Sequence, residues 1–577
     1  MKILAVHDGH NATACFLEDG EIISMVSEER FTNIKNQGGF PSLSIEWILK
    51  TQAISMADLD YIVFPHLVSP VMYPFNSQSE WSKRDLFMLV NQIFPKSIIG
   101  SPSLVGSYIK LFKRVRVSTL KSYSQKFGFD FDKVCQVEHH TSHGYAALYG
   151  SVYSAEEGDV LVFTCDDSGD GLSSTVAAWS MEKGYRILQQ TPSFHSIGDL
   201  YARVTQYLGM KAGEHEYKVM GMAPYVSEES SQGAYYKFLE YINFDLKNGA
   251  IKKNRLYGKR MLKRMKNDFF MERFDNVCGG LQRVFEHVVV SWVRYWAQKT
   301  CIRTAVFGGG SFMNVKANML ISQLKELDHV YFCPSSGDES TAMGAAYYVA
   351  QKNGEKKIEP LKSLYKGPSY NRNEVEAALE KYKDQTVREK PADIDVHTAG
   401  LLSDGKIIAR FRGPAEWGAR ALGNRSILCR ADDPRIISIL NKAIKMRDFW
   451  MPFAPSILEE DSDRYLSNPN NILCPNMTLT FETNKEARCE IISALHPYDF
   501  SCRPQIVNKE TNQSYHRLLL SFQELTGYSG LLNTSFNLHG SPIVGTPENA
   551  LNTLMTSRID YLVLEEYLVR AKPGCRP

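Results

Sequence analysis

The sequence has almost no excess of charge of either sign. It contains 66 lysines and arginines against 64 aspartates and glutamates, which gives a formal net charge of +2 at pH 7. A nucleic acid or an anionic membrane surface is usually bound by a strong positive excess, so the bulk charge supports neither partner. Any anion that the protein binds must be held by local groups.

Paired cysteines and long apolar runs are also missing. The 11 cysteines are scattered from Cys15 to Cys575 without a CxxC pair, so neither a disulfide framework nor a thiolate metal site is indicated. No run of about 18 apolar residues occurs, and the opening MKILAV reaches His7 and Asp8 too early for a signal-peptide core. We therefore expect a cytoplasmic protein without a membrane partner.

The pattern that is present predicts an α/β protein of several units. A length of 577 residues allows about four units of ~150 residues. The first strands turn at Asp19-Gly20, and a similar hairpin pattern with an acidic, glycine-rich turn returns at 159–179, which suggests two similar halves. After a polar stretch and Gly367-Pro368 new helices and strands begin, so we predict domains over 1–358 and 365–577.

Three polar or glycine-rich loops follow strand-like runs in the first domain. They contain Asp8-Gly9, the sequence DDSGDG and Gly308-Gly309-Gly310. A glycine loop between a strand and a helix lets a phosphate or ribose approach backbone N–H groups, although a single loop of this kind is often only a tight turn. Together the three loops predict a nucleotide cleft between two sheets.

The segment VEHHTSHGYAALYGS is a candidate metal site. His139 and His143 are four residues apart, which places both imidazoles on one face of a helix. Asp338, in the loop before another predicted helix, is a candidate third ligand, and two histidines with one carboxylate suit Fe(II) or Zn(II). The alternative is a pair of interior histidines without a metal.

Cations, hydroxyl groups and small residues cluster in the second domain. Guanidinium groups and hydroxyls are the donors that a polyanionic small molecule requires, whereas surface ion pairs are the alternative. The candidate anion-binding residues are Arg420, Arg425, Arg430, Lys445, Arg447, Arg503, Thr534 and Ser535. Two further basic stretches, 110–121 and 252–266, are better explained as solvated helix faces.

Taken in order, the motifs GHNATACFLEDG, EERFTNIK, HHTSH, DDSGDG, KVMGMAPY, GGGSFMNVKAN, GDES, ARALGNRSI, KAIKMR, PFAPS and NTSFN resemble the O-carbamoyltransferases of antibiotic and nodulation-factor biosynthesis. The resemblance covers nearly the whole chain. It implies a two-lobed actin/Hsp70-like (Kae1-like) N-terminal domain, similar to the domain that transfers threonylcarbamoyl to tRNA. It also implies a YrdC-like α/β C-terminal domain.

The resemblance implies a two-step reaction. The C-terminal domain would make carbamoyl-adenylate from carbamoyl phosphate and ATP, with Mg²⁺ on the ATP phosphates. The N-terminal domain would then transfer the carbamoyl group to a hydroxyl of a small natural product. The expected partners are these substrates, with a homodimer left open and no nucleic acid expected.

The same resemblance implies roles for individual residues. His10 would be the base, Lys35 would contact the adenylate, and His139, His143 and Asp338 would hold Fe(II) or another divalent metal. The nucleotide-lining residues would be Asp166, Gly309, Gly310 and Asn314 in the first domain and Ser535 in the second. Asp166 could instead only cap a turn, and Asn314 could only begin a helix.

One position departs from the family, because Met451 stands where an arginine usually precedes PFAP. Arg447 or another residue would then have to hold that phosphate. Three rival functions stay open: threonylcarbamoyl transfer to tRNA, a sugar-kinase-like phosphotransferase, and a nucleotide- or metal-binding regulator without turnover. The acceptor cannot be predicted from the sequence.

Overall fold

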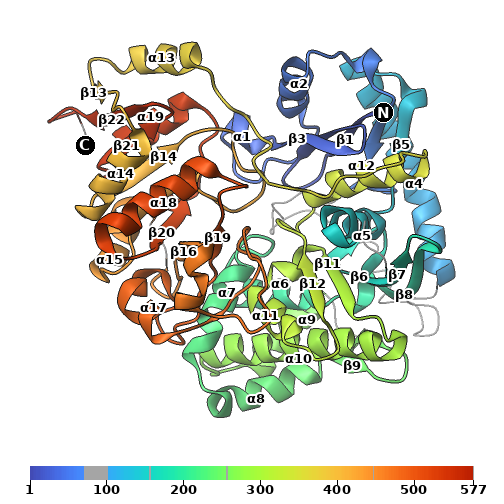
Figure 1. Ribbon diagram of the computed structural model, residues 1–577. Coiled ribbons are helices and arrows are strands. Elements are labelled where there is room, and N and C mark those ends of the chain that lie inside the picture. The colour runs from blue at the N-terminus through green and yellow to red at the C-terminus, as the bar shows by residue number, and fades with distance from the viewer. Residues whose placement is uncertain (71–101, 155–157, 255–257, 446–447, 576–577) are drawn as a thin grey trace. The chain divides into compact units, whose positions relative to one another are not determined.

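The computed structural model describes residues 1–70, 102–154, 158–254, 258–445 and 448–575. The chain divides into two compact units. Unit 1 contains residues 1–23 and 38–361, and unit 2 contains residues 24–37 and 362–577. The prediction of a mixed α/β protein is confirmed, because strands and helices alternate in both units (Figure 1).

Unit 1 contains two five-stranded sheets with the same strand order. The first runs β3-β2-β1-β4-β5 and the second runs β8-β7-β6-β11-β12. Their bounds are β1 (Lys2–His7), β2 (Thr13–Glu18), β3 (Glu21–Ser27), β4 (Tyr61–Phe64), β5 (Val134–Gln136), β6 (Val160–Gly169), β7 (Leu172–Ser180), β8 (Gly184–Pro192), β11 (Thr304–Gly308) and β12 (His329–Phe332). The hairpins expected around Asp19-Gly20 and at 159–179 are β2–β3 and β6–β7.

Each sheet combines an antiparallel edge with three parallel strands. In the first, β1, β4 and β5 are parallel, and in the second β6, β11 and β12 are parallel. Side chains at the carboxyl ends of parallel strands gather at one edge of a sheet. The polar and glycine-rich segments of the sequence lie at the ends of β1, β6 and β11, at this edge.

Two helices lie between the sheets of unit 1. Helix α12 (Ser340–Lys352) packs on β1, β2 and β4, whereas α5 (His139–Gly150) packs on β6 and β11, and the two helices pack against each other (Figure 1). They approach so closely that a Cβ on Gly344 would lie 1.7 Å from the Ser142 carbonyl oxygen. This contact brings the first turn of α5 beside the start of α12.

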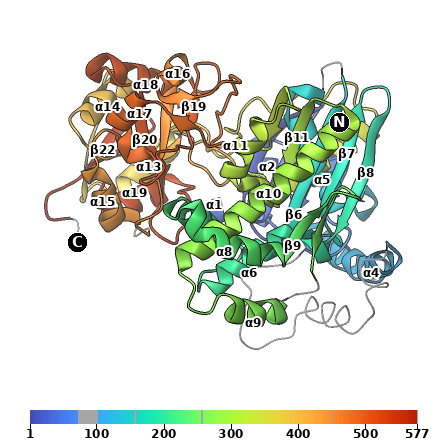
Figure 2. The same cartoon turned by 90° about the horizontal axis from the view of Figure 1, so that it is seen from below.

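The remaining elements of unit 1 are helices, some of which pack on one sheet or the other, and the separate two-stranded sheet of β9 and β10. Helix α10 (Phe274–Thr300) runs along α8 (Glu228–Leu239) and contacts α11 (Val315–Ser322) (Figure 2). The others are α2 (Ser42–Thr51), α4 (Pro102–Phe127), α6 (Ile197–Tyr207), α7 (Glu216–Met222), α9 (Gly258–Asp268), β9 (Ile242–Asp245) and β10 (Ala250–Lys253). Among the described residues, no helix has the length and apolarity needed to cross a membrane.

Unit 2 is built on one mixed sheet of eight strands, in the order β13-β22-β21-β14-β15-β20-β16-β19. Helices α14 and α18 pack together on a buried core that includes Ile408, Leu428, Val563 and Leu518. The strands are β13 (Thr386–Glu389), β14 (Ile408–Phe411), β15 (Arg425–Arg430), β16 (Ala454–Leu458), β19 (Gln505–Val507), β20 (Gly530–Ser535), β21 (Tyr561–Leu564) and β22 (Tyr567–Ala571). The helices are α1 (Glu29–Thr32), α13 (Arg372–Lys381), α14 (Ile394–Ser403), α15 (Arg435–Leu440), α16 (Ser462–Tyr465), α17 (Lys485–Glu490), α18 (Gln513–Thr526) and α19 (Pro547–Met555).

Candidate metal centre and anion-binding residues

Two histidines and two aspartates of unit 1 form a compact cluster. The cluster consists of His139 and His143 from α5, Asp166 from β6 and Asp338 from the turn before α12. One ligand atom from each residue lies within 4.8 Å of every other. The helix spacing that predicted a shared face for the two histidines is therefore realised in the structure.

The distances within this cluster suit one metal ion. His139 Nε2 lies 3.2 Å from Asp166 Oδ2 and 3.8 Å from Asp338 Oδ1. His143 Nε2 lies 3.5 and 3.7 Å from the same two oxygens. Ligands about 2.1 Å from a tetrahedral ion are about 3.4 Å apart, which falls inside this range. His143 Nε2 is buried and makes no hydrogen bond with any described residue, as expected of a nitrogen that awaits a ligand.

The carboxylates set the protonation of the two histidines. Burial opposes the charged imidazolium of His139, but the hydrogen bond that Asp166 accepts from it and the charges of Asp338 and Asp166 raise its pKa to about 9. For His143 the same carboxylates outweigh burial and the charge of His139, so its pKa is also raised. Although burial opposes ionisation of Asp166, the two histidines hold its pKa well below the usual range. The cluster thus favours a cation at its centre.

Glycines allow the backbone to close around these ligands. A Cβ on Gly310 would lie 2.8 Å from Asp166 Oδ1, and a Cβ on Gly169 would lie 2.0 Å from His139 Cδ2. The preceding Gly309 has φ +98°, a conformation that L residues rarely adopt. The glycine loop therefore touches the carboxylate of the cluster directly.

The other predicted residues of the first domain are more dispersed. His10 lies half-buried in the loop after β1, and its carbonyl oxygen is 2.9 Å from His7 Nε2. Asn314 caps α11 through Ala317 N, and its amide exchanges two hydrogen bonds of 3.0 Å with Gln282. Lys35 is exposed and belongs to unit 2.

In unit 2 the predicted anion-binding residues flank a buried polar network. Asn533 donates to Ser456 Oγ at 2.9 Å and to Gln505 Oε1 at 3.1 Å. Thr534 follows Asn533 on β20, is 5% exposed, and its hydroxyl has no hydrogen-bond partner among the described residues. Arg503 is half-buried two residues before Gln505.

The remaining predicted cations and hydroxyls of unit 2 have different environments. Arg420 is half-buried, and Ser535 donates to Asn537 Oδ1 at 2.7 Å. Lys445 ends a π-helical turn, Asn441–Lys445, and Arg447 lies outside the described residues.

Two arginines of the predicted cation cluster are engaged within the protein. Arg425 is fully buried, donates to the carbonyl oxygens of Gly413 and Pro368, and lies 3.6 Å from the centre of the Phe411 ring. Arg430 forms an ion pair with Asp432 at 2.5 Å. These two side chains stabilise unit 2.

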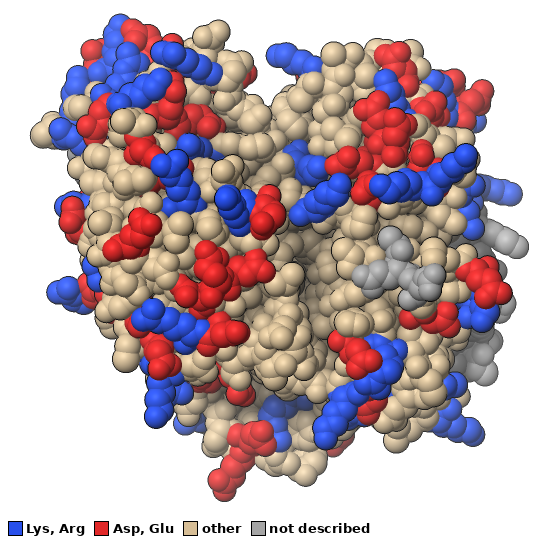
Figure 3. Space-filling model, viewed as in Figure 1, with Lys and Arg blue, Asp and Glu red and all other residues tan. Residues whose placement is uncertain are grey.

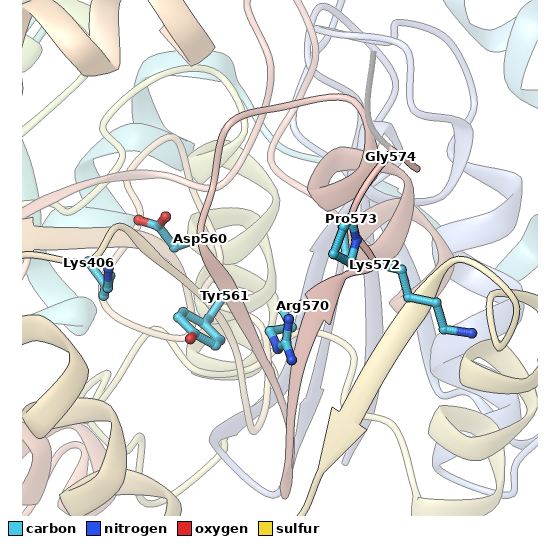
Figure 4. Close-up of a pocket in the computed structure, with 8 residues that line it drawn as sticks. Lys406, Asp560, Tyr561, Arg570, Lys572, Pro573 and Gly574 are labelled. Atoms are coloured by element: carbon cyan, nitrogen blue, oxygen red, sulfur yellow. The ribbon is translucent and has the colours of Figure 1, made fainter.

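A surface pocket of unit 2 contains charged residues that the sequence did not single out. It is lined by Lys406, Asp560, Tyr561, Arg570, Ala571, Lys572, Pro573 and Gly574 (Figure 4). Asp560 accepts a hydrogen bond from Ile407 N at 2.7 Å, and Lys572 donates to the Lys383 carbonyl oxygen at 3.0 Å. Lys406 and Arg570 are exposed, and no predicted site residue lines the pocket, so we assign it no ligand.

Sequence comparisons place the chain in a family of enzymes. Residues 2–347 match the family model described as carbamoyltransferase N-terminus, and residues 399–571 match the model described as carbamoyltransferase C-terminus. The chain therefore belongs to the carbamoyltransferase family and is a transferase, as the motifs predicted.

Relatives match over most of the chain. An uncharacterized protein of Methanocaldococcus jannaschii is 30% identical, with 99% of this chain and 100% of that protein covered. Nodulation protein NolNO of Sinorhizobium fredii is 28% identical over 98% of this chain and 79% of its own. Nodulation protein NolO of Bradyrhizobium diazoefficiens is 30% identical over 76% and 79%. A solved structure of HypF, in a phosphate- and nucleotide-bound form, is 13% identical over 62% of this chain and 56% of that chain, with a TM-score of 0.29, too low to carry an argument.

Proposed function

We propose that this protein is an ATP-dependent O-carbamoyltransferase that forms carbamoyl-adenylate in residues 365–577 and transfers the carbamoyl group in residues 1–358. The observation that carries the proposal is the cluster of His139, His143, Asp166 and Asp338 in a chain that matches the carbamoyltransferase family in both parts. An actin/Hsp70-like fold for the first domain is supported by its two sheets of identical strand order. A YrdC-like fold for the second rests on the motif resemblance.

The first step requires groups that gather phosphates. Water cleaves carbamoyl phosphate to carbamate and phosphate, and a carbamate oxygen then attacks the α-phosphorus of ATP and displaces pyrophosphate. Carbamate, ATP and the developing pyrophosphate are all anionic, so Arg420, Lys445, Arg447 and Arg503 would offset their charge, with Mg²⁺ on the ATP phosphates. The Thr534 hydroxyl, which no other described residue hydrogen-bonds, and the Ser535 hydroxyl would donate to the nucleotide.

The second step requires a base and an electrophile. An acceptor hydroxyl attacks the carbamoyl carbon, the bond to the AMP oxygen breaks, and the hydroxyl proton passes to a base, for which we propose His10. His139, His143, Asp166 and Asp338 would hold Fe(II) or another divalent ion, which supplies a Lewis acid for the carbonyl oxygen. Lys35 would bind the adenylate phosphate, and Gly309, Gly310 and Asn314 would line the nucleotide.

The substrates that we propose are carbamoyl phosphate, ATP and a small hydroxylated natural product. Positive and negative side chains are interspersed on the face of the molecule that Figure 3 shows, in keeping with the net charge of +2. This charge pattern does not favour tRNA as the acceptor.

The test is the nucleotide product. With carbamoyl phosphate, ATP and an accepted alcohol, we expect AMP, pyrophosphate and a carbamate detectable by mass spectrometry. His139→Ala and His143→Ala should lose carbamate formation but keep pyrophosphate release. ADP as the sole product would contradict the proposal in favour of a phosphotransferase, and transfer that survives removal of the metal would contradict the roles assigned to the cluster.

A further inference from the structure

Three buried histidines form a hydrogen-bonded chain that ends at the metal cluster. His7 Nε2 is 2.9 Å from the His10 carbonyl oxygen, and His7 Nδ1 is 3.0 Å from His66 Nε2. His66 Nδ1 is 3.3 Å from His139 Nδ1, and His139 directs its other nitrogen, Nε2, at Asp166 and Asp338. The three rings are at most 3% exposed.

The carbonyl at one end of the chain fixes the tautomer of every ring. A carbonyl oxygen can only accept, so His7 must carry its proton on Nε2, which leaves Nδ1 as an acceptor. His66 Nε2–H then donates to His7, and the bare Nδ1 of His66 accepts from His139 Nδ1–H. Because His66 holds the proton on Nδ1, His139 would give up its Nε2 proton when a metal ion binds and would present the Nε2 lone pair, at the nitrogen that faces the two carboxylates.

The surroundings favour this assignment over its reverse. Thr341 Oγ1 lies 3.3 Å from His7 Nδ1, but its proton is donated to the Asp338 carbonyl oxygen. In the reverse set of tautomers, His7 Nε2 would carry no proton and would face the His10 carbonyl oxygen, so that two acceptors would point at each other.

The carboxylate of Asp170 ties the loop that carries His66 to the start of the helix that carries His139. Asp170 accepts from the backbone N–H groups of Leu67 and His139, each at 2.9 Å from Oδ2, and from Val68 N at 2.9 Å from Oδ1. The His66 carbonyl oxygen accepts from Gln136 Nε2 at 2.9 Å. The loop that carries His66 is therefore fixed against the start of α5.

We propose that His66, supported by His7, is a positioning residue that orients His139 and fixes its tautomer for metal binding. The inference rests on the proposed metal site. Hydrogen-bond partners of this kind raise the basicity of a ligating imidazole and restrict its rotation, and their loss typically weakens metal binding by about 10- to 100-fold. His7 and His66 come from the loops and strand ends of the first sheet, whereas the carboxylate Asp166 comes from the second.

The test uses Co(II) as a spectroscopic probe of the full-length protein after removal of bound metal by a chelator. His66→Phe keeps a planar ring but removes both nitrogens, and we expect Co(II) affinity about 10- to 100-fold below that of the parent, with a changed d–d absorption band. His66→Asn keeps an acceptor close to the position of Nδ1 and should restore most of the affinity. His140→Phe is the matched control, because His140 is equally buried beside His139 but bonds to Thr164 Oγ1 at 2.8 Å.

The outcomes separate this inference from the proposed function. Parent-like affinity and absorption in His66→Phe, or an equal loss in His140→Phe, would overturn the positioning role. Parent protein that binds no Co(II) would overturn both the metal site and the positioning role. Parent protein that binds Co(II) but forms no carbamate would contradict only the proposed function. If His66→Phe fails to fold, His7→Phe breaks the next link; a weaker but measurable loss of affinity supports the role, and parent-like binding refutes it.

Discussion

At the scale of single residues, the structure defines the surroundings of Asp166, a residue whose role the sequence left ambiguous. It was expected to line a nucleotide or to cap a turn, yet its carboxylate faces both histidines of the cluster. As a fourth donor it would add negative charge and complete a set of two imidazoles and two carboxylates, which suits a divalent transition metal.

Asp166→Asn keeps the size of the side chain but removes its charge. Because an amide is a weaker ligand and cannot offset a dication, we expect metal affinity to fall at least about 10-fold, with loss of carbamate formation. Pyrophosphate release from carbamoyl phosphate and ATP should persist. Asp167→Asn, at the next position of the same strand, is the control and should bind metal normally; equal metal content in both variants would contradict a ligand role for Asp166.

The metal-free protein should lose stability as the pH rises. The pKa of His139 is raised from 6.5 to about 9, so the folded state holds its proton more tightly than the unfolded state does. The stabilisation is fully present below pH 6.5 and is lost between pH 6.5 and about 9, and it amounts to at most about 3 kcal/mol. Urea unfolding of chelator-treated protein across this range measures it. His139→Gln should flatten the profile, and a parent profile that is already flat would contradict the raised pKa.

The residues of the cluster differ in how far the sequence could predict them. His139 and His143 follow from helical spacing alone, and Asp338 was a candidate from its place in a polar loop before a predicted helix, which the family resemblance then also implied. Asp166, His7 and His66 have no fixed spacing to these residues, because strand pairing and the packing of α5 on β6 bring them together. Apart from the nucleotide-lining role that the family resemblance implied for Asp166, their only sequence signal is that Asp166 and His7 end apolar strand-like runs.

At the scale of elements, the strands and hairpins were well predicted and a helix boundary was not. The two hairpins and the glycine loop after β11 lie where alternation and turn residues placed them. The apolar spacing of residues 315–327 predicts a helix over that whole range, but α11 ends at Ser322, and a short 3-10 turn, Gly310–Met313, precedes it. The apolar spacing continues beyond Ser322 because Leu324 and Leu327 are buried outside a helix.

A substitution in the glycine loop after β11 tests how closely this loop packs against Asp166. In Gly310→Ala the new Cβ would meet Asp166 Oδ1 at 2.8 Å, so the carboxylate must move and we expect weaker metal binding. Gly233→Ala, in α8, is the matched control, because its Cβ would meet nothing within 4 Å and alanine should stabilise the helix by about 1 kcal/mol. Metal titration and thermal unfolding measure both effects. Unchanged metal affinity in Gly310→Ala would contradict the close approach.

At the scale of the whole molecule, one segment near the N-terminus belongs to the C-terminal unit. Residues 24–37, which contain α1 and the EERFTNIK motif, belong to unit 2 although unit 1 residues flank them in the sequence. Met25 N donates to the Lys366 carbonyl oxygen at 3.1 Å, and Arg30 donates to the Gly418 carbonyl oxygen at 2.8 Å. No pattern of spacing could reveal this, since the contacts join positions more than 300 residues apart.

This arrangement predicts that a substitution near the N-terminus destabilises the C-terminal unit. Arg30 is 5% exposed and forms an ion pair with Glu29 at 2.6 Å, so Arg30→Ala leaves a buried carboxylate without its cation and should cost unit 2 about 3–5 kcal/mol. Hydrogen exchange measured by mass spectrometry should show faster exchange in peptides of residues 362–575 and unchanged exchange around α5. Metal binding should stay normal while pyrophosphate release declines.

Lys35→Ala provides the contrast within the same segment. The Lys35 side chain is exposed, so its removal should change the free energy of unfolding by less than about 0.5 kcal/mol. If Lys35 binds the adenylate as we propose, carbamate formation should nevertheless fall. Faster exchange around α5 in Arg30→Ala, with residues 362–575 unaffected, would place the segment with unit 1 and refute its assignment to unit 2.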